Sequence, residues 1–203
     1  MSFKAKFLKL LRELMIVFIG VFAAFLLNDY RNGKIDKNEI KNTYAIIYED
    51  LDSYYECGKR ENEEGFINLF ESMVKNTERV IQNKELPYGF DLVGDYWNIE
   101  LINSMLLSGK LNNIDPEIFK HVSRFHTVHS NMLNYIKKFN YFYDEHVVPN
   151  LDKGMAEFYD SGNDKLKLKY QRLLDYQEAI LSFSKLTVEM AEDLKEEIKS
   201  KHI

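Results

Sequence analysis

The pattern of apolar and polar positions divides the chain into one uninterrupted apolar run and a longer amphipathic remainder. Residues 14–27, LMIVFIGVFAAFLL, contain no charged or strongly polar side chain. If this run is helical, its 14 consecutive apolar residues, Phe18, Val21, Phe22 and Phe25 among them, leave the helix no polar face. Such a helix is buried either in a protein core or in a lipid bilayer.

Features on both sides of the run favour the bilayer. A membrane-spanning helix needs about 20 apolar residues, more than residues 14–27 provide. The apolar character continues upstream of the run, where the side chains of Lys9 and Arg12 are long enough to reach the lipid headgroups. At the other end of the run, Tyr30 suits the opposite membrane–water interface. We predict an uncleaved transmembrane anchor at residues 14–31, after a basic amphipathic segment at residues 1–13 that contacts lipid. The alternative is the central helix of a soluble bundle.

The remainder of the chain repeats apolar residues with a helical period. The pattern predicts an all-α fold, in which an N-terminal single transmembrane helix is followed by an extramembrane helical bundle at residues 32–203. Asp115, Pro116 and Glu117 match the preferred residues at a helix start. The helices are expected at about residues 35–57, 61–83, 96–108, 115–145 and 165–199, with a loop at residues 85–95.

The distribution of charge suggests an orientation and excludes one class of partner. Residues 1–31 hold five basic and two acidic residues, a net charge of +3, so the total of −5 leaves −8 for residues 32–203. The positive-inside rule then favours a cytoplasmic N-terminus and an exported C-terminal domain. An acidic domain is a poor partner for nucleic acid. Cys57 is the only cysteine, so no disulfide can form within the chain.

Small residues in the apolar run could form a helix-packing surface. Gly20 and Ala24 are four positions apart, and Ala23 widens the same patch. This spacing lets two membrane helices approach closely, although Gly and Ala are also common in membrane helices in general. The pattern therefore predicts a homo-oligomer.

Two groups of residues suggest possible binding chemistry. His126 and His129 are three positions apart on one predicted helix and are weak candidates for a metal site. The sequence motifs of di-iron bundles and zinc proteases are absent, so we predict no metal, no cofactor and no catalytic residue. We expect the histidines at surface or capping positions. Among 13 Tyr and 14 Phe, most are expected in the core, but Tyr141, Phe142 and Tyr143 lie on several helix faces and predict a partner surface.

The N-terminal region resembles a family of uncharacterised, small, single-pass bacterial membrane proteins, typical of Bacteroidetes and grouped as a domain of unknown function. The resemblance rests on Glu13, the apolar helix with the pair Ile19-Gly20, and Ala24 and Asn28 near its end. Asp29 and Tyr30 stand where members usually have Asn and Trp. The segment 107–111, LSGKL, resembles a mid-chain segment of the family. The resemblance implies a membrane anchor and a helical extramembrane domain, without a known reaction.

These observations predict a non-enzymatic protein of the inner (cytoplasmic) membrane, single-pass, with a periplasmic C-terminal domain. We interpret it as a self-associating scaffold, sensor or assembly protein of the bacterial envelope, with membrane lipid and an envelope protein as partners. One alternative is a helical enzyme that binds a metal or a small molecule at His126 and His129. Another is a membrane-disrupting effector.

Replacing Gly20 and Ala24 together with Leu tests the predicted self-association. Leu should preserve insertion but separate the helix backbones, and should weaken the oligomer by on the order of 1 kcal/mol or more. Association can be measured in detergent for the full chain and for residues 1–60. Unchanged association in both would show that the small residues are incidental.

Overall fold

The computed structural model describes residues 18, 22, 26, 37–87, 92, 98–161 and 165–202. The chain divides into two compact units, Met1–Thr43 and Tyr44–Ile203. The described residues form helices and no strand, which confirms the all-α prediction for them. Among them, no helix has the length and apolar character needed to cross a membrane. Apart from Phe18, Phe22 and Leu26, the predicted anchor lies outside the described residues, as do the basic segment at 1–13 and the small residues Gly20, Ala23 and Ala24.

The helices of the second unit follow the predicted order. Residues 37–58 are helical, and residues 44–58 of this helix belong to the second unit. The following elements are α2 (Phe66–Asn83), α3 (Glu100–Ser108), the 3-10 turn η1 (Lys110–Asn113), α4 (Pro116–Phe142), the π-helical turn η2 (Tyr143–Val147), the 3-10 turn η3 (Val148–Lys153), α5 (Met155–Phe158) and α6 (Leu168–His202).

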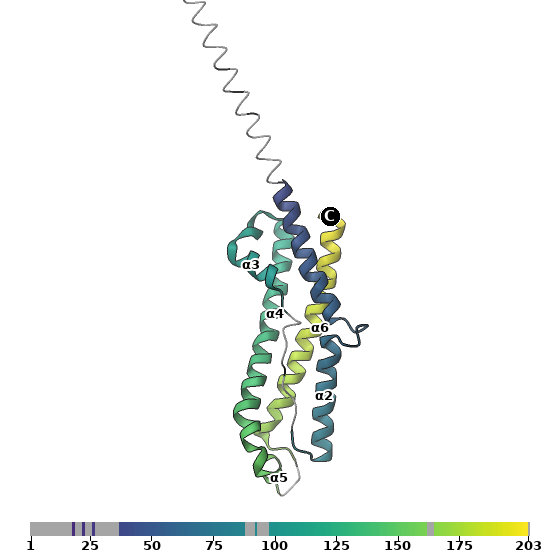
Figure 1. Cartoon of the computed structure of the whole chain (residues 1–203), viewed down its shortest axis with the longest axis vertical. Coiled ribbons are helices and arrows are strands. Elements are labelled where there is room, and N and C mark those ends of the chain that lie inside the picture. Colours follow the sequence, from purple (N-terminus) through teal and green to yellow (C-terminus); the bar gives the residue numbers. More distant parts are fainter. Residues whose placement is uncertain are drawn as a thin grey trace, which may run out of the picture. The chain divides into compact units, whose positions relative to one another are not determined.

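The longest helix, α6, organises the second unit (Figure 1). It runs antiparallel to α4, since His121 pairs with Glu197 near one end and Phe142 contacts Tyr176 near the other. At about 1.5 Å per residue its 35 residues extend about 50 Å. Its C-terminal half packs against residues 44–58, and its N-terminal half packs against α2. Two consecutive shorter helices thus cover one long helix.

Tyr54 lies where these helices meet. Its side chain is 1% exposed, and its hydroxyl lies 2.7 Å from Thr187 Oγ1 on α6. Its ring contacts Phe66 on α2 and Phe125 and His129 on α4, with ring centroids 5.2 to 5.5 Å apart. One aromatic side chain therefore contacts three other helices, and its polar atom is satisfied within the core.

The short helix α3 is tied to residues 44–58. Its N-cap residue forms no capping hydrogen bond of its own, but the Ile102 amide donates to Asp50 Oδ2 at 2.9 Å. The carboxylate thus satisfies one of the free amides at the helix start. Burial raises the pKa of Asp50. Nearby, the Asp115 amide donates to the Tyr44 hydroxyl at 2.8 Å, and the Tyr44 ring stacks on His202 with centroids 3.9 Å apart.

The second helix begins later than predicted, at Phe66 instead of residue 61. The reason is a tight turn, in which the Gly65 amide donates to Asn62 O and the Asn68 side chain donates to Arg60 O and Asn62 O. The turn starts at Gly58, where a Cβ atom would lie 2.5 Å from a Val188 methyl carbon. A larger residue at position 58 would push apart the helices that meet there.

The helix α4 begins as predicted, because Asp115 Oδ1 accepts hydrogen bonds from the Glu117 and Ile118 amides and Pro116 occupies the first helical position. It ends three residues before the expected end at residue 145 and continues as the π-helical turn η2. The last helix starts at Leu168, slightly after the predicted residue 165.

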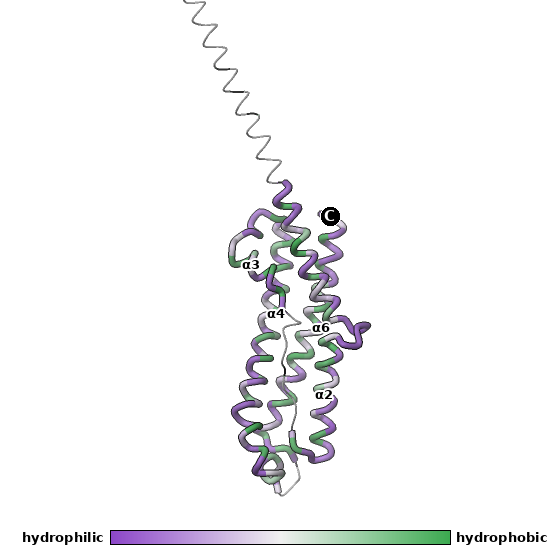
Figure 2. Tube along the Cα trace, in the orientation of Figure 1, coloured by the Kyte–Doolittle hydropathy of each residue, from purple (hydrophilic) through white to green (hydrophobic). Residues whose placement is uncertain are grey.

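Apolar and polar residues alternate along every described helix of the second unit, as its hydropathy colouring shows (Figure 2). Most of the apolar residues face inward. Five described polar residues are buried with them, and Gln177 on α6 is one of these. Neither its amide nitrogen nor its amide oxygen has a hydrogen-bond partner among the described residues, and the same holds for Thr77 Oγ1 on α2. An unpaired buried amide costs about 1 to 3 kcal/mol.

Replacing Gln177 with Met, which has a similar volume and no hydrogen-bonding group, should therefore stabilise the protein by about 1 to 2 kcal/mol. Urea unfolding followed by circular dichroism measures the change. Gln171→Met is the matched control on the same helix, because Gln171 is exposed and donates to Leu166 O at 3.0 Å. The control should not gain stability. A loss of stability in Gln177→Met would show that internal water satisfies the amide.

Candidate functional site

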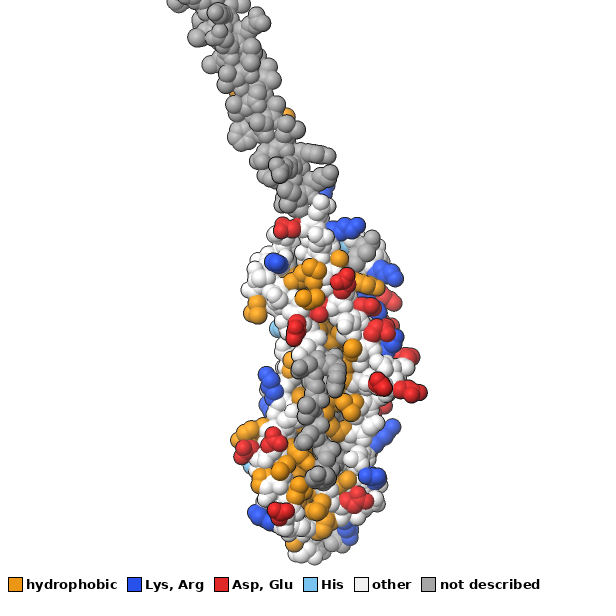
Figure 3. All heavy atoms as spheres, viewed as in Figure 1, with side chains coloured by type: hydrophobic (Ala, Val, Ile, Leu, Met, Phe, Trp, Pro, Cys, Tyr) orange, Lys and Arg blue, Asp and Glu red, His pale blue; other side chains and the backbone are white. Residues whose placement is uncertain are grey.

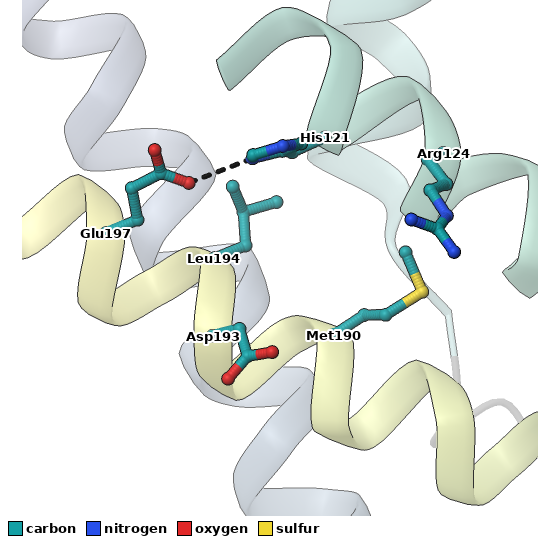
Figure 4. A pocket seen from close by; sticks show the side chains of 6 residues that line it. All are labelled: His121, Arg124, Met190, Asp193, Leu194 and Glu197. Carbon is teal, nitrogen blue, oxygen red and sulfur yellow. Dashed lines mark hydrogen bonds and ion pairs between the residues drawn. The ribbon is translucent and has the colours of Figure 1, made fainter. Parts of the chain in front are cut away.

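A cleft of about 200 Å³ lies between α4 and α6. Its floor is apolar, formed by Met190 and Leu194. Four charged or titratable side chains surround it in the close-up (Figure 4): His121 and Arg124 from α4, and Asp193 and Glu197 from α6. The spacing of three residues on α4 and four on α6 places each pair on one face of its helix.

Glu197 connects the two sides of the cleft. Its Oε2 lies 2.9 Å from His121 Nδ1, and its Oε1 lies 2.7 Å from Lys201 Nζ. Hydrogen bonds from Lys201 and then from His121 lower the pKa of Glu197. The carboxylate is therefore the charged partner of an interhelical contact, and holds the C-terminal part of α6 against α4.

The cleft combines one histidine, one arginine and two carboxylates with two apolar side chains. The Arg124 guanidinium and the Asp193 carboxylate form no ion pair with a described residue. They flank the apolar floor with charges of opposite sign. The arrangement could hold a small polar molecule or a side chain of another protein.

The two histidines predicted as weak metal candidates lie in different environments. His129 is 1% exposed and packs its ring against Tyr54 and Phe125. His126 is half-buried. Within the part of the chain that the structure describes, no three metal-ligating side chains lie close enough together to hold an ion. His129 is therefore a core residue, in contrast to the expected surface or capped position.

Only one of the three residues predicted as a partner surface is accessible. Tyr141 is 67% exposed, whereas Phe142 and Tyr143 are 5% and 3% exposed. Phe142 packs against His146 and Tyr176, and Tyr143 stacks on Phe139. The prediction is wrong for Phe142 and Tyr143, because they lie three and four positions after the buried Phe139 and therefore share its inward face.

In the first unit, three large apolar side chains are strongly exposed. Phe18, Phe22 and Leu26 are helical, follow each other at intervals of four residues, and are 65%, 56% and 55% exposed. The rings of Phe18 and Phe22 stack with centroids 6.3 Å apart. Residues at this spacing share one face of a helix, so these side chains form an apolar stripe.

The sequence analysis missed two exposed leucines of the second unit. Leu107 on α3 is 90% exposed and Leu168 at the start of α6 is 80% exposed. Both fall outside the apolar stripe of their own helix, and this position is the signal that could have identified them. The space-filling view shows how charged and hydrophobic side chains share one face of the second unit (Figure 3).

Comparison with known proteins gives no relative. No protein-family profile, curated protein or solved structure matches this chain.

Acid should weaken the contact that Glu197 makes with α4. Because its pKa is lowered in the folded state, the carboxylate stabilises the fold above its ordinary pKa of 4.5, and this contribution is lost as the pH falls through the lower, folded value. Glu197→Gln should reduce stability at pH 7 and make stability less dependent on pH below 4.5. Thermal unfolding between pH 7 and pH 3 measures this.

Glu196→Gln is the matched control. It removes the same charge from the neighbouring position, where the side chain is exposed. It should retain the pH dependence of the natural protein. Equal behaviour of the two variants would show that the His121–Glu197 contact does not contribute to stability.

Proposed function

We propose that this chain is a membrane-anchored, self-associating helical scaffold or assembly protein of the bacterial envelope. In this proposal residues 14–31 cross the inner membrane once, the N-terminus is cytoplasmic, and the second unit lies in the periplasm. The second unit contributes binding surfaces and performs no reaction.

The exposure of Phe18, Phe22 and Leu26 is the observation that carries the proposal. Each is helical and more than half exposed, within a run of 14 residues that contains no charge. Exposing three large apolar side chains to water at adjacent helical turns is unfavourable, at about 25 cal/mol per Å² of apolar surface. A lipid environment removes this cost and requires no polar face on the helix.

The second unit supports a role in binding. The aromatic residues that could have lined a ligand pocket are mostly used in the core, including Tyr54, Phe70, Phe125, Phe139 and Tyr170. The enzyme alternative depends on His126 and His129. His129 lies in the core, whereas His126 is half-buried. The surface that remains is charged, with an interhelical cleft and a few exposed apolar residues.

Replacing Phe18 and Phe22 together with Asp tests the anchor. An acidic residue near the centre of a membrane helix costs about 2.5 to 3.5 kcal/mol, so the double variant should no longer insert. The natural protein should stay in the membrane pellet after extraction at alkaline pH, and the variant should be released.

Leu107→Asp is the control for this experiment. It introduces an acidic residue at Leu107, the most exposed large apolar side chain among the described residues of the second unit, and should leave the protein in the membrane. Release of the natural protein by alkaline extraction would contradict the anchor. Retention of the double variant would place the attachment elsewhere in the chain.

The orientation can be measured separately. Alkaline phosphatase fused after Ile203 should be active, and a fluorescent protein that folds only in the cytoplasm should be dark at the same position. The physical reason is the net charge of +3 in residues 1–31, which favours retention of the N-terminus on the cytoplasmic side. The reverse pattern would place the second unit in the cytoplasm.

A further inference from the structure

One face of the antiparallel pair α4 and α6 is partly exposed along most of its length. Its positions follow each other in alternating steps of three and four residues, from His121 to Lys138 on α4 and from Tyr176 to Glu197 on α6. Such steps place side chains on one face of a helix, as in the contact surface of a coiled coil. We call these positions the α4–α6 face. The cleft described above lies at one end of it.

The centre of the α4–α6 face is apolar and continuous. The Tyr135 ring contacts the rings of Tyr176 and Phe183, with centroids 6.3 and 5.5 Å apart. Leu186, beside them on α6, is 40% exposed. The larger half-buried apolar side chains of the centre are Val128, Tyr135, Tyr176, Phe183 and Met190.

The other helices of the second unit contact α6 through different positions. On α2, Glu71 pairs with Lys185 of α6, and the Tyr54 hydroxyl from residues 44–58 meets Thr187. Neither Lys185 nor Thr187 belongs to the α4–α6 face. The apolar centre is therefore a contiguous patch that is left half-buried where α4 and α6 meet.

The charges of the α4–α6 face cancel and are sorted by helix. Apart from its one histidine, the face has two basic residues, Arg124 and Lys138, both on α4. It has two acidic residues, Asp193 and Glu197, both on α6. Arg124 and Asp193 form no ion pair with a described residue. An otherwise acidic chain thus presents a face without net charge, on which two copies can meet without repulsion.

We propose that two copies of this chain associate through the α4–α6 face in the same direction, so that α4 of each copy packs on α6 of the other. A twofold axis parallel to the helices produces this arrangement, and every contact then occurs twice. The His121–Glu197 contact puts Arg124 and Asp193 at about the same level of the helix pair. The axis therefore places Arg124 of each copy opposite Asp193 of the other, and the basic helix meets the acidic one.

The distribution of charge disfavours the opposite direction. An antiparallel pair would place α4 on α4 and α6 on α6. Arg124 and Lys138 lie seven positions on either side of Asn131, near the middle of the face. Full overlap of the apolar centres would therefore bring Arg124 of one copy close to Lys138 of the other, and like charges there repel. A strongly charged partner would gain little from a face whose charges cancel.

The size of the α4–α6 face fits a dimer. From Tyr176 to Glu197 it extends about 30 Å, at about 1.5 Å per residue. Two helices side by side are about 20 Å wide, so the face covers roughly 600 Å² in projection. Side chains raise the accessible area above the projected one, toward the roughly 800 Å² that each partner buries in a stable interface.

This inference rests on the proposed self-association and names its surface in the second unit. The anchors could associate without this face, and the face could associate without the anchors. The experiments below therefore distinguish the two contacts.

Cross-linking between single cysteines tests the arrangement in the full chain in detergent. In a Cys57→Ser background, differently tagged Arg124→Cys and Asp193→Cys chains are mixed and treated with a short bis-maleimide. We expect a mixed cross-linked dimer and little cross-linking within either variant alone. Each mixed dimer keeps its second Arg124–Asp193 pair, so the substitutions leave half of the charge contacts in place.

Glu189→Cys is the matched control for Asp193→Cys. Glu189 is exposed one helical turn earlier on α6, but it lines a groove against Tyr55 and Lys59, outside the α4–α6 face. Mixed with Arg124→Cys, it should give no cross-linked dimer.

A second measurement uses the apolar centre. Leu186→Asp should raise the dissociation constant of the dimer about tenfold or more, because it buries an unpaired carboxylate in the contact. Sedimentation equilibrium in detergent measures this in the Gly20→Leu and Ala24→Leu background, where any contact between anchors is already weakened. Leu69→Asp is the matched control, since Leu69 is 45% exposed but lies on α2. It should leave the dissociation constant unchanged.

Three results would overturn the inference. Cross-linking of Arg124→Cys with Lys138→Cys in place of Asp193→Cys would show an antiparallel pair. Equal cross-linking of Asp193→Cys and Glu189→Cys, or equal effects of the two Asp variants, would exclude the α4–α6 face and leave self-association through the anchor. A natural chain that is monomeric in detergent and in bilayers would contradict the proposed self-association itself.

Discussion

The contacts of Tyr54 are the constraint on which the second unit depends. Its ring and hydroxyl reach α2, α4 and α6, and its hydroxyl is satisfied by Thr187 at 2.7 Å. The hydroxyl also lies 3.8 Å from the sulfur of Met132. Burial raises the pKa of Tyr54, which favours the protonated, neutral phenol. A single residue therefore fixes the distance between four helical segments.

The aromatic core explains why the predicted functional residues did not coincide with a site. His129 packs against Tyr54 and Phe125 in the core. Phe142 and Tyr143 pack against other aromatic residues at the C-terminal end of α4. The features left for interaction are the cleft between α4 and α6, the exposed leucines and the apolar stripe of the first unit.

Local chemistry was sufficient to predict much of the fold. The Asp115 cap and Pro116 fixed the start of α4, and the absence of Gly and Pro predicted the long α6. The position of Gln177 in the core could also be read from its place in the apolar stripe between Leu173 and Ile180. These features depend on residues three or four positions apart.

Features that depend on distant residues could not be predicted in this way. Asp50 satisfies the start of α3 across a separation of 52 residues, and the late start of α2 depends on side-chain bonds of Asn62 and Asn68. The π-helical turn that follows α4 at Tyr143 was not predicted either.

The depth of residue 22 in a bilayer tests the central claim, that the apolar run is an anchor, most directly. In a Cys57→Ser background, Phe22→Cys carries an environment-sensitive fluorophore, and Tyr141→Cys, at a position 67% exposed in the second unit, is the control. In proteoliposomes we expect the label at position 22 to be quenched by a quencher in the lipid tails and protected from iodide. The label at position 141 should show the reverse. Iodide quenching of the label at position 22 as strong as at position 141 would contradict the account.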